Sequence, residues 1–176
     1  MPENRKWLSA GFSLPELLIT MVLLAVVAQL AMPPLERWQQ ETRLRNQAQR
    51  LVLFLRHAQQ MAMSENKPVY VLSSHTPAPG CMVITFSIHC ACMSPTPCAI
   101  RHSQQFQLFK GRMQLLGSTY TAVKPAMFQA LSGLSFGHAG SFVVGEGSLQ
   151  VKVILNNLGR IRLCTPADPV TAIAPC

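Results

Sequence analysis

The stretch Gly11–Thr20, GFSLPELLIT, opens a hydrophobic run that continues to Met32 and decides how the chain is organised. A helix rises about 1.5 Å per residue, so Phe12–Met32 is long enough to cross a hydrocarbon core of roughly 30 Å. Glu16 is the single ionisable residue in the run. A carboxylate inside a membrane helix costs about 2.5–3.5 kcal/mol even on lenient insertion scales. We therefore expect Glu16 to have a partner and a function.

The segment in front of the run, Met1–Gly11, is short and polar and contains Arg5 and Lys6. Positive charge beside a membrane span holds that end in the cytoplasm, so the rest of the chain is expected across the membrane. Three interpretations compete. A secretory signal peptide cut near Ala28 would contain Glu16 in an apolar region that is too long. A plain signal anchor leaves Glu16 and the Gly11-Phe12 junction unexplained. The third interpretation is a class III leader cut after Gly11.

Gly11-Phe12-Ser13-Leu14-Pro15-Glu16 resembles the prepilin peptidase motif of type IV pilins and type II secretion pseudopilins. The resemblance implies that a membrane peptidase cuts after Gly11 and methylates the new amino terminus, Phe12. The physical reasoning for Glu16 is independent of the family. Cutting creates an α-amine inside the apolar layer, and the Glu16 carboxylate of a neighbouring subunit can neutralise it.

Composition fits one membrane element and one globular domain in 176 residues. The charged fraction is only 12%, yet the net charge is +8. Beyond Asn66 there are eight Lys or Arg residues against two acids, Glu146 and Asp168. A basic, sparsely charged surface favours polyanions or an anionic membrane, and simple solubility is the alternative explanation.

A helical pattern follows the apolar run. Pro33-Pro34 is expected to kink or loosen the helix, because proline lacks an amide donor and clashes with the preceding turn. From Leu35 to about Glu65 apolar residues recur at helical spacing, and Asn66-Lys67-Pro68 should end the helix. The stripe consists of Leu44, Ala48, Leu51, Leu55, Ala58 and Ala62, while Arg37, Arg43, Arg45, Arg50 and Arg56 mostly fall elsewhere on the cylinder.

The remainder of the chain changes to the alternation that is typical of strands. The predicted architecture is α+β, with a long N-terminal helix packed on antiparallel β-sheets. The last two strands, on either side of Asn156-Asn157-Leu158-Gly159, are expected to form a hairpin. The predicted strands are 69–72, 82–86, one or two within 106–116, 134–136, 141–144, 149–155 and 160–163, with 77–80 as a turn.

The C-terminal half of the chain resembles one family within the pilins and pseudopilins. Leu134-Ser135-Phe136, the glycines that follow it, and the segment Asn156–Cys164 are similar to the GspH/FimT family. This family contains the minor pseudopilin H of type II secretion and the minor pilins T and U of type IV pili. Membership implies a non-enzymatic filament subunit without cofactors. Its partners would be other minor and major pilins or pseudopilins, the prepilin peptidase and the bacterial inner membrane, with the C-terminal domain in the periplasm.

The resemblance and the composition together define four segments. They are a cleaved leader (1–11), a transmembrane and polymerisation helix (12–33), its amphipathic continuation (34–66) and a periplasmic β-rich domain (67–176). We find no catalytic constellation, and His57, His75 and His138 are isolated. The expected role is assembly of a type IV pilus or secretion pseudopilus, near the filament tip.

Arg160 and Arg162 form the candidate DNA-binding element. Side chains alternate along a strand, so both arginines should point to one face, and Lys152 on the preceding strand could join them if the register allows. In the FimT branch a Gly-Arg-x-Arg element is associated with binding double-stranded DNA during natural transformation. Edge-strand charges that discourage aggregation are the structural alternative.

All six cysteines follow residue 80, and an exported domain with an even cysteine count usually contains disulfides. Cys164 and Cys176 bracket a short C-terminal loop, and members of the family often pair these positions. The remaining four are open to three pairings. A zinc site with His89 and His102 is an alternative, although the spacing fits no common zinc motif. These four cysteines are Cys81, Cys90, Cys92 and Cys98.

Overall fold

The structure is a computed structural model of the whole chain. It describes residues 13–76, 80–90, 92 and 113–176, and for residues 30–34 it describes the backbone alone. The chain divides into two compact units, Met1–Gln39 and Gln40–Cys176. One helix, α1 (Leu14–Ser64), contributes to both units, and the strands all belong to the second.

The first part of α1 presents large apolar side chains that are at least half exposed, from Leu14 to Val27. Among the residues that the structure describes, no helix is both long enough and apolar enough to cross a membrane. The predicted span, 12–33, includes Phe12 and the side chains of residues 30–33, which lie outside the described part.

The helix does not end at the two prolines. α1 continues through Pro33 and Pro34 as a single element. The kink or loosening expected at these prolines stays a prediction. It ends where the sequence predicts. The Glu65 amide donates to the Met61 carbonyl at 2.9 Å, and Asn66 then takes a positive φ of 51°. Asparagine tolerates this left-handed conformation, which commonly terminates a helix.

The predicted apolar stripe is confirmed, because all six of its side chains are fully buried. They join apolar residues of both sheets in one core, and the side chains of Val71, Phe142 and Val153 are among them. Arg43, Arg50 and Arg56 are exposed, as expected. Arg45 differs, since it is half-buried and its Nε has no hydrogen-bond partner.

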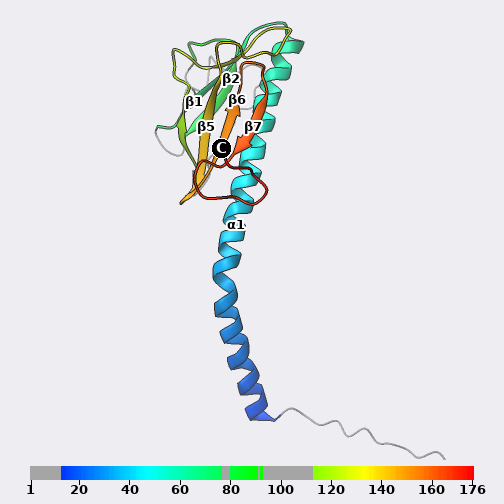
Figure 1. Cartoon of the computed structure of the whole chain (residues 1–176), viewed down its shortest axis with the longest axis vertical. Helices are drawn as coiled ribbons and strands as arrows, with labels where there is room; N and C mark the ends of the chain where they lie inside the picture. Colours follow the sequence, from blue (N-terminus) through cyan, green and yellow to red (C-terminus); the bar gives the residue numbers. More distant parts are fainter. Residues whose placement is uncertain (1–12, 77–79, 91, 93–112) are drawn as a thin grey trace, which may run out of the picture. The chain divides into compact units, whose positions relative to one another are not determined.

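Two antiparallel sheets cover the second part of α1 (Figure 1). The first has the strand order β2-β1-β4 and the second has the order β3-β5-β6-β7. The β6–β7 hairpin is confirmed, with Ile154 opposite Arg162. The strands are β1 (Val69–Ser74), β2 (Cys81–Thr85), β3 (Gln114–Ser118), β4 (Ala126–Phe128), β5 (Gly140–Glu146), β6 (Leu149–Leu155) and β7 (Ile161–Cys164).

Two strand predictions need correction. β4 has three residues and was not predicted, because it is too short to show a pattern. The expected strand at Leu134–Phe136 is a turn instead. Its Ser135 hydroxyl donates to the Met127 carbonyl at 2.6 Å, and the His138 amide donates to the Ser135 carbonyl at 2.9 Å. Most of the predicted strand region 106–116 and the turn residues 77–79 lie outside the described residues.

The C-terminal loop is fastened at both ends and in its middle. Cys164 and Cys176 form a disulfide with their Cα atoms 4.9 Å apart, in agreement with the pairing that the resemblance implied. Between them, the Thr171 hydroxyl and amide donate to Glu41 Oε2 on α1, at 2.6 and 3.2 Å. Val170 is buried in the core. The loop is therefore an integral part of the second unit.

The buried stripe yields a stability prediction with a neighbouring control. Leu55→Ala should lower the free energy of unfolding by about 2–5 kcal/mol, because it leaves a cavity in the core. Leu53→Ala removes the same atoms from a side chain that is 62% exposed, and should change the free energy by less than about 0.5 kcal/mol. Denaturant unfolding of the full chain in detergent measures both. Equal losses of unfolding free energy would show that burial of the stripe does not stabilise the domain.

Candidate functional site

The turn between β6 and β7 is organised by the side chain of Asn156. Its Oδ1 accepts hydrogen bonds from the amides of Leu158 at 3.0 Å and Arg160 at 2.8 Å. The backbone closes the same turn, with the Asn156 amide donating to the Arg160 carbonyl and the Gly159 amide to the Asn156 carbonyl. A short polar side chain that bonds nearby amides is the usual way to fix such a turn. Arg160 therefore leaves a fixed backbone position.

Gly159 is required at this turn for two reasons. Its φ is 73°, in the region that residues with a Cβ rarely adopt. A Cβ built there would lie 2.5 Å from the Gly133 carbonyl oxygen and 2.6 Å from Gln59 Nε2. The Gln59 amide on α1 donates to the carbonyls of Gly133 at 2.8 Å and Gly159 at 3.3 Å. The helix thus holds two turns together through one side chain.

The predicted cations lie on the outer side of the second sheet. β6 alternates strictly between buried and half-buried residues, which places Lys152 and Ile154 on the outer face. Arg162 is exposed and lies opposite Ile154. Lys152 lies opposite Cys164, so it is the diagonal neighbour of Arg162, at a Cβ separation of about 7–8 Å for such pairs. The register therefore brings Lys152 onto the face of Arg162, and exposed Arg160 lies just before β7.

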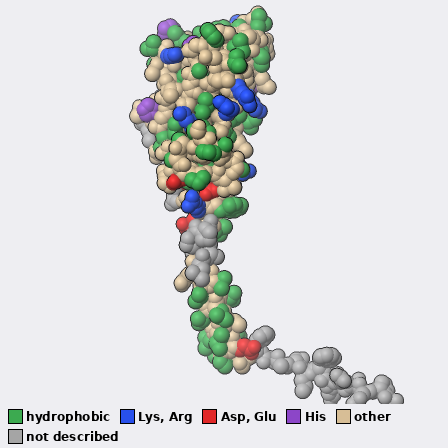
Figure 2. All heavy atoms as spheres, viewed as in Figure 1, with side chains coloured by type: hydrophobic (Ala, Val, Ile, Leu, Met, Phe, Trp, Pro, Cys, Tyr) green, Lys and Arg blue, Asp and Glu red, His purple; other side chains and the backbone are tan. Residues whose placement is uncertain are grey.

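The charge around this site has one sign. β6, the turn and β7 contain no carboxylate side chain. Figure 2 shows Lys and Arg side chains at several places on the visible face of the second unit. On the opposite side of β7, Ile161 and Leu163 line a groove of about 450 Å³ together with Arg56 of α1. An anionic ligand would meet no electrostatic opposition along the strip Arg160, Arg162 and Lys152.

Two disulfides were expected among Cys81, Cys90, Cys92 and Cys98, and the described residues contain one of them. Cys81 and Cys92 form a disulfide, with Cα atoms 6.0 Å apart. Cys90 carries a free thiol, so it does not take part in the expected second disulfide of this group. The Thr85 hydroxyl lies 3.3 Å from the Cys90 sulfur. Cys98 and His102 lie outside the described residues. In the part of the chain that is described, no three His, Cys, Asp or Glu side chains could hold a metal ion together.

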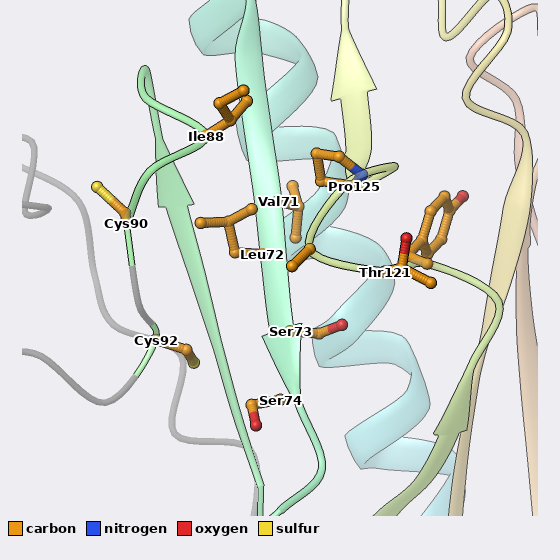
Figure 3. A pocket seen from close by; sticks show the side chains of 11 residues that line it. Val71, Leu72, Ser73, Ser74, Ile88, Cys90, Cys92, Thr121 and Pro125 are labelled. Carbon is orange, nitrogen blue, oxygen red and sulfur yellow. The ribbon is translucent and has the colours of Figure 1, made fainter.

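A cavity of about 300 Å³ lies beside this disulfide (Figure 3). β1 contributes Ser73 and Ser74, and the neighbouring segments contribute Cys90 and Thr121. The described lining includes neither a carboxylate nor an imidazole, so no general base faces these hydroxyl and thiol groups. His138 is engaged elsewhere, with Nδ1 2.7 Å from the Pro125 carbonyl oxygen.

The described part of the N-terminal motif, Ser13–Glu16, lies at the start of α1. The Ser13 carbonyl accepts hydrogen bonds from the amides of Glu16 at 3.0 Å and Leu17 at 3.2 Å. Glu16 is exposed in the first turn of the helix, where the helix dipole favours a negative charge. Gly11 and Phe12, the residues expected to flank the processed bond, lie outside the described residues.

Residues 8–28 match the family model described as the prokaryotic N-terminal methylation motif. The chain carries the methylation motif that is typical of type IV pilins and pseudopilins. Proteins with this motif are inner-membrane-anchored prepilins that prepilin peptidase processes and that assemble with other pilins. Pilins are structural subunits rather than enzymes. No curated protein and no solved structure matches the chain.

Sequence reasoning missed Gln59, which joins α1 to the turn that bears Arg160. A signal was available, since Gln59 directly follows Ala58 of the buried stripe and is a polar residue beside the core. Its two acceptors are separated from it by 74 and 100 residues. No local pattern indicates which carbonyls such a side chain will reach.

The constraint at Gly159 can be measured against a second glycine. Gly147→Ala should cost about 1–2 kcal/mol of unfolding free energy, because φ is 62° but a Cβ there has nothing within 4 Å. Gly159→Ala adds the collision with Gly133 and Gln59 and should cost clearly more. Thermal or denaturant unfolding of both variants makes the comparison. Equal costs would show that the turn does not depend on close approach to α1.

Proposed function

We propose that this chain is a minor pilin or pseudopilin of the GspH/FimT type, a non-enzymatic subunit needed for filament assembly near the tip. The observation that carries the proposal is the methylation motif at the start of a long helix that packs on antiparallel sheets. In this proposal residues 12–33 anchor the chain in the inner membrane, and the domain 67–176 lies in the periplasm. Disulfides at Cys81–Cys92 and Cys164–Cys176 suit such an oxidising compartment.

Glu16 supplies the chemistry of assembly in this proposal. Removal of residues 1–11 leaves an α-amine on Phe12 within an apolar layer, where an unpaired charge is costly. The Glu16 carboxylate is exposed on α1 and free to meet the amine of another subunit. An ion pair between the Phe12 amine of one subunit and the Glu16 carboxylate of its neighbour then compensates both buried charges. Because the pair forms at one position only, it sets the axial register of each incoming subunit.

Processing and assembly should separate in two variants. Gly11→Leu should retain residues 1–11, which mass spectrometry of the membrane fraction detects. Glu16→Gln should be cleaved and methylated at Phe12 but absent from sheared filaments. Glu36→Gln, an acid on the same helix beyond the apolar run, is the control and should assemble normally. Normal filament incorporation of Glu16→Gln would contradict the assigned role.

A second function is favoured by the basic strip. Arg160 and Arg162 are exposed, Lys152 shares the face of Arg162, and no carboxylate lies on these strands or their turn. Contacts between such cations and phosphates would be independent of base sequence and sensitive to salt. In this second proposal the chain is a DNA-binding minor pilin that acts in DNA uptake for natural transformation.

DNA binding by the full chain in detergent tests the second function. The double change Arg160→Ala, Arg162→Ala should lower affinity for a blunt duplex by roughly tenfold or more, and reduce the slope of log K against log salt by about 1.8. The matched control is Arg50→Ala, Lys124→Ala, which removes two exposed cations elsewhere. Unchanged affinity in the first variant would leave Arg160 and Arg162 as structural charges.

A further inference from the structure

Four apolar side chains are exposed at the end of the second unit where α1 ends. We call them the distal apolar cluster. Figure 2 shows hydrophobic side chains at this end of the domain. The members and their exposed fractions are Met63 at 40%, Leu131 at 69%, Phe136 at 69% and Leu158 at 72%.

Hydrogen bonds and a close approach join the segments that carry the cluster. The Ser135 amide donates to the Asn157 carbonyl at 3.0 Å, and the Gly137 amide donates to Asn157 Oδ1 at 3.2 Å. The two donors, Ser135 and Gly137, stand on either side of Phe136 in the sequence, and their shared acceptor, Asn157, directly precedes Leu158. Gly133 closes the group, since a Cβ there would lie 3.1 Å from the Met63 sulfur. The four side chains therefore belong to one neighbourhood.

The backbone beneath the cluster is fixed. The Gln59 side chain donates hydrogen bonds to the Gly133 and Gly159 carbonyls, one in each turn. Leu131 has a φ of 60° in a loop that the Gln129 amide closes by donating to the Leu134 carbonyl. A single exposed leucine needs no explanation, but several on preorganised turns do. Side chains that are already positioned lose less entropy on binding, so they add more to affinity.

Charge narrows the choice of partner. The turns 129–139 and 156–160 contain no carboxylate side chain, and Arg160 lies beside Leu158. The helix end adds Glu65 and Lys67, whose charges offset each other. A complementary surface has an apolar centre and carboxylates at its rim. A symmetric contact with a second copy would bring the two Arg160 guanidinium groups together in a chain of net charge +8.

We propose that the distal apolar cluster docks a different pilin-like subunit of the same filament, through an apolar surface rimmed by carboxylates. The proposal rests on the filament-subunit function. Three of the four side chains are aliphatic, which favours a protein, because nucleic-acid bases are held by stacking on flat aromatic faces.

The test places a photo-crosslinking amino acid at residue 158 of the full chain in the cells that assemble it. The matched control is residue 123, where Val123 is 94% exposed and away from the cluster. We expect a crosslink at 158, absent at 123, to a protein that itself carries the N-terminal methylation motif. Crosslinks to DNA, to a second copy of this chain, or equally from both positions would overturn the proposal.

A second measurement separates this proposal from the function on which it rests. Phe136→Ser, Leu158→Ser should still lose residues 1–11 and fold normally, because both side chains are exposed. Its recovery in sheared filaments should fall at least tenfold, while Val123→Ser should be recovered as the parent chain is. Full recovery of the double variant would overturn the docking site and leave the filament function intact. Absence of the parent chain from filaments would overturn both.

Discussion

Burial of the α1 stripe is the constraint on which the second unit depends. Leu44, Leu51 and Leu55 are fully buried, and each contributes about 1.5–3 kcal/mol relative to an exposed side chain. The alanines between them keep the helix close to the sheets. Both sheets meet the helix in a single core, so neither sheet buries its apolar face without α1.

The packing of α1 on the two sheets also fixes the position of Gln59. It lies next to the buried stripe, where its amide reaches the Gly133 and Gly159 carbonyls. Those two turns then carry different kinds of surface, a basic strip that starts at Arg160 and an apolar cluster that includes Leu158. A rigid base under both surfaces lowers the entropy lost on binding. One helix residue thus supports the two binding surfaces inferred for the protein.

The C-terminal loop strengthens the opposite side of the domain. Its disulfide closes the chain after β7, and Glu41 of α1 accepts two hydrogen bonds from Thr171. A closed loop of this length adds about 3 kcal/mol in the chain-entropy model. The helix is therefore linked to the last strand through the loop and through the turn at Gly159. Both links hold β7, an edge strand that bears Arg162, against α1.

The sequence by itself determined the elements whose signal is local. The period of α1, its end at Asn66, the β6–β7 hairpin and the N-terminal motif depend on residues that are neighbours in the chain. Leu134–Phe136 was wrongly predicted as a strand because Ser135 bonds to Met127, outside any local window.

Only the tertiary structure decided the features that depend on distant residues. It selected Cys92 as the partner of Cys81, placed Lys152 diagonally to Arg162, and brought Met63, Leu131, Phe136 and Leu158 to one end of the domain. These outcomes follow from packing and hydrogen bonds between segments as far apart as Gln59 and Gly159. Sequence periodicity reports which face of an element is buried, but not which segment covers it.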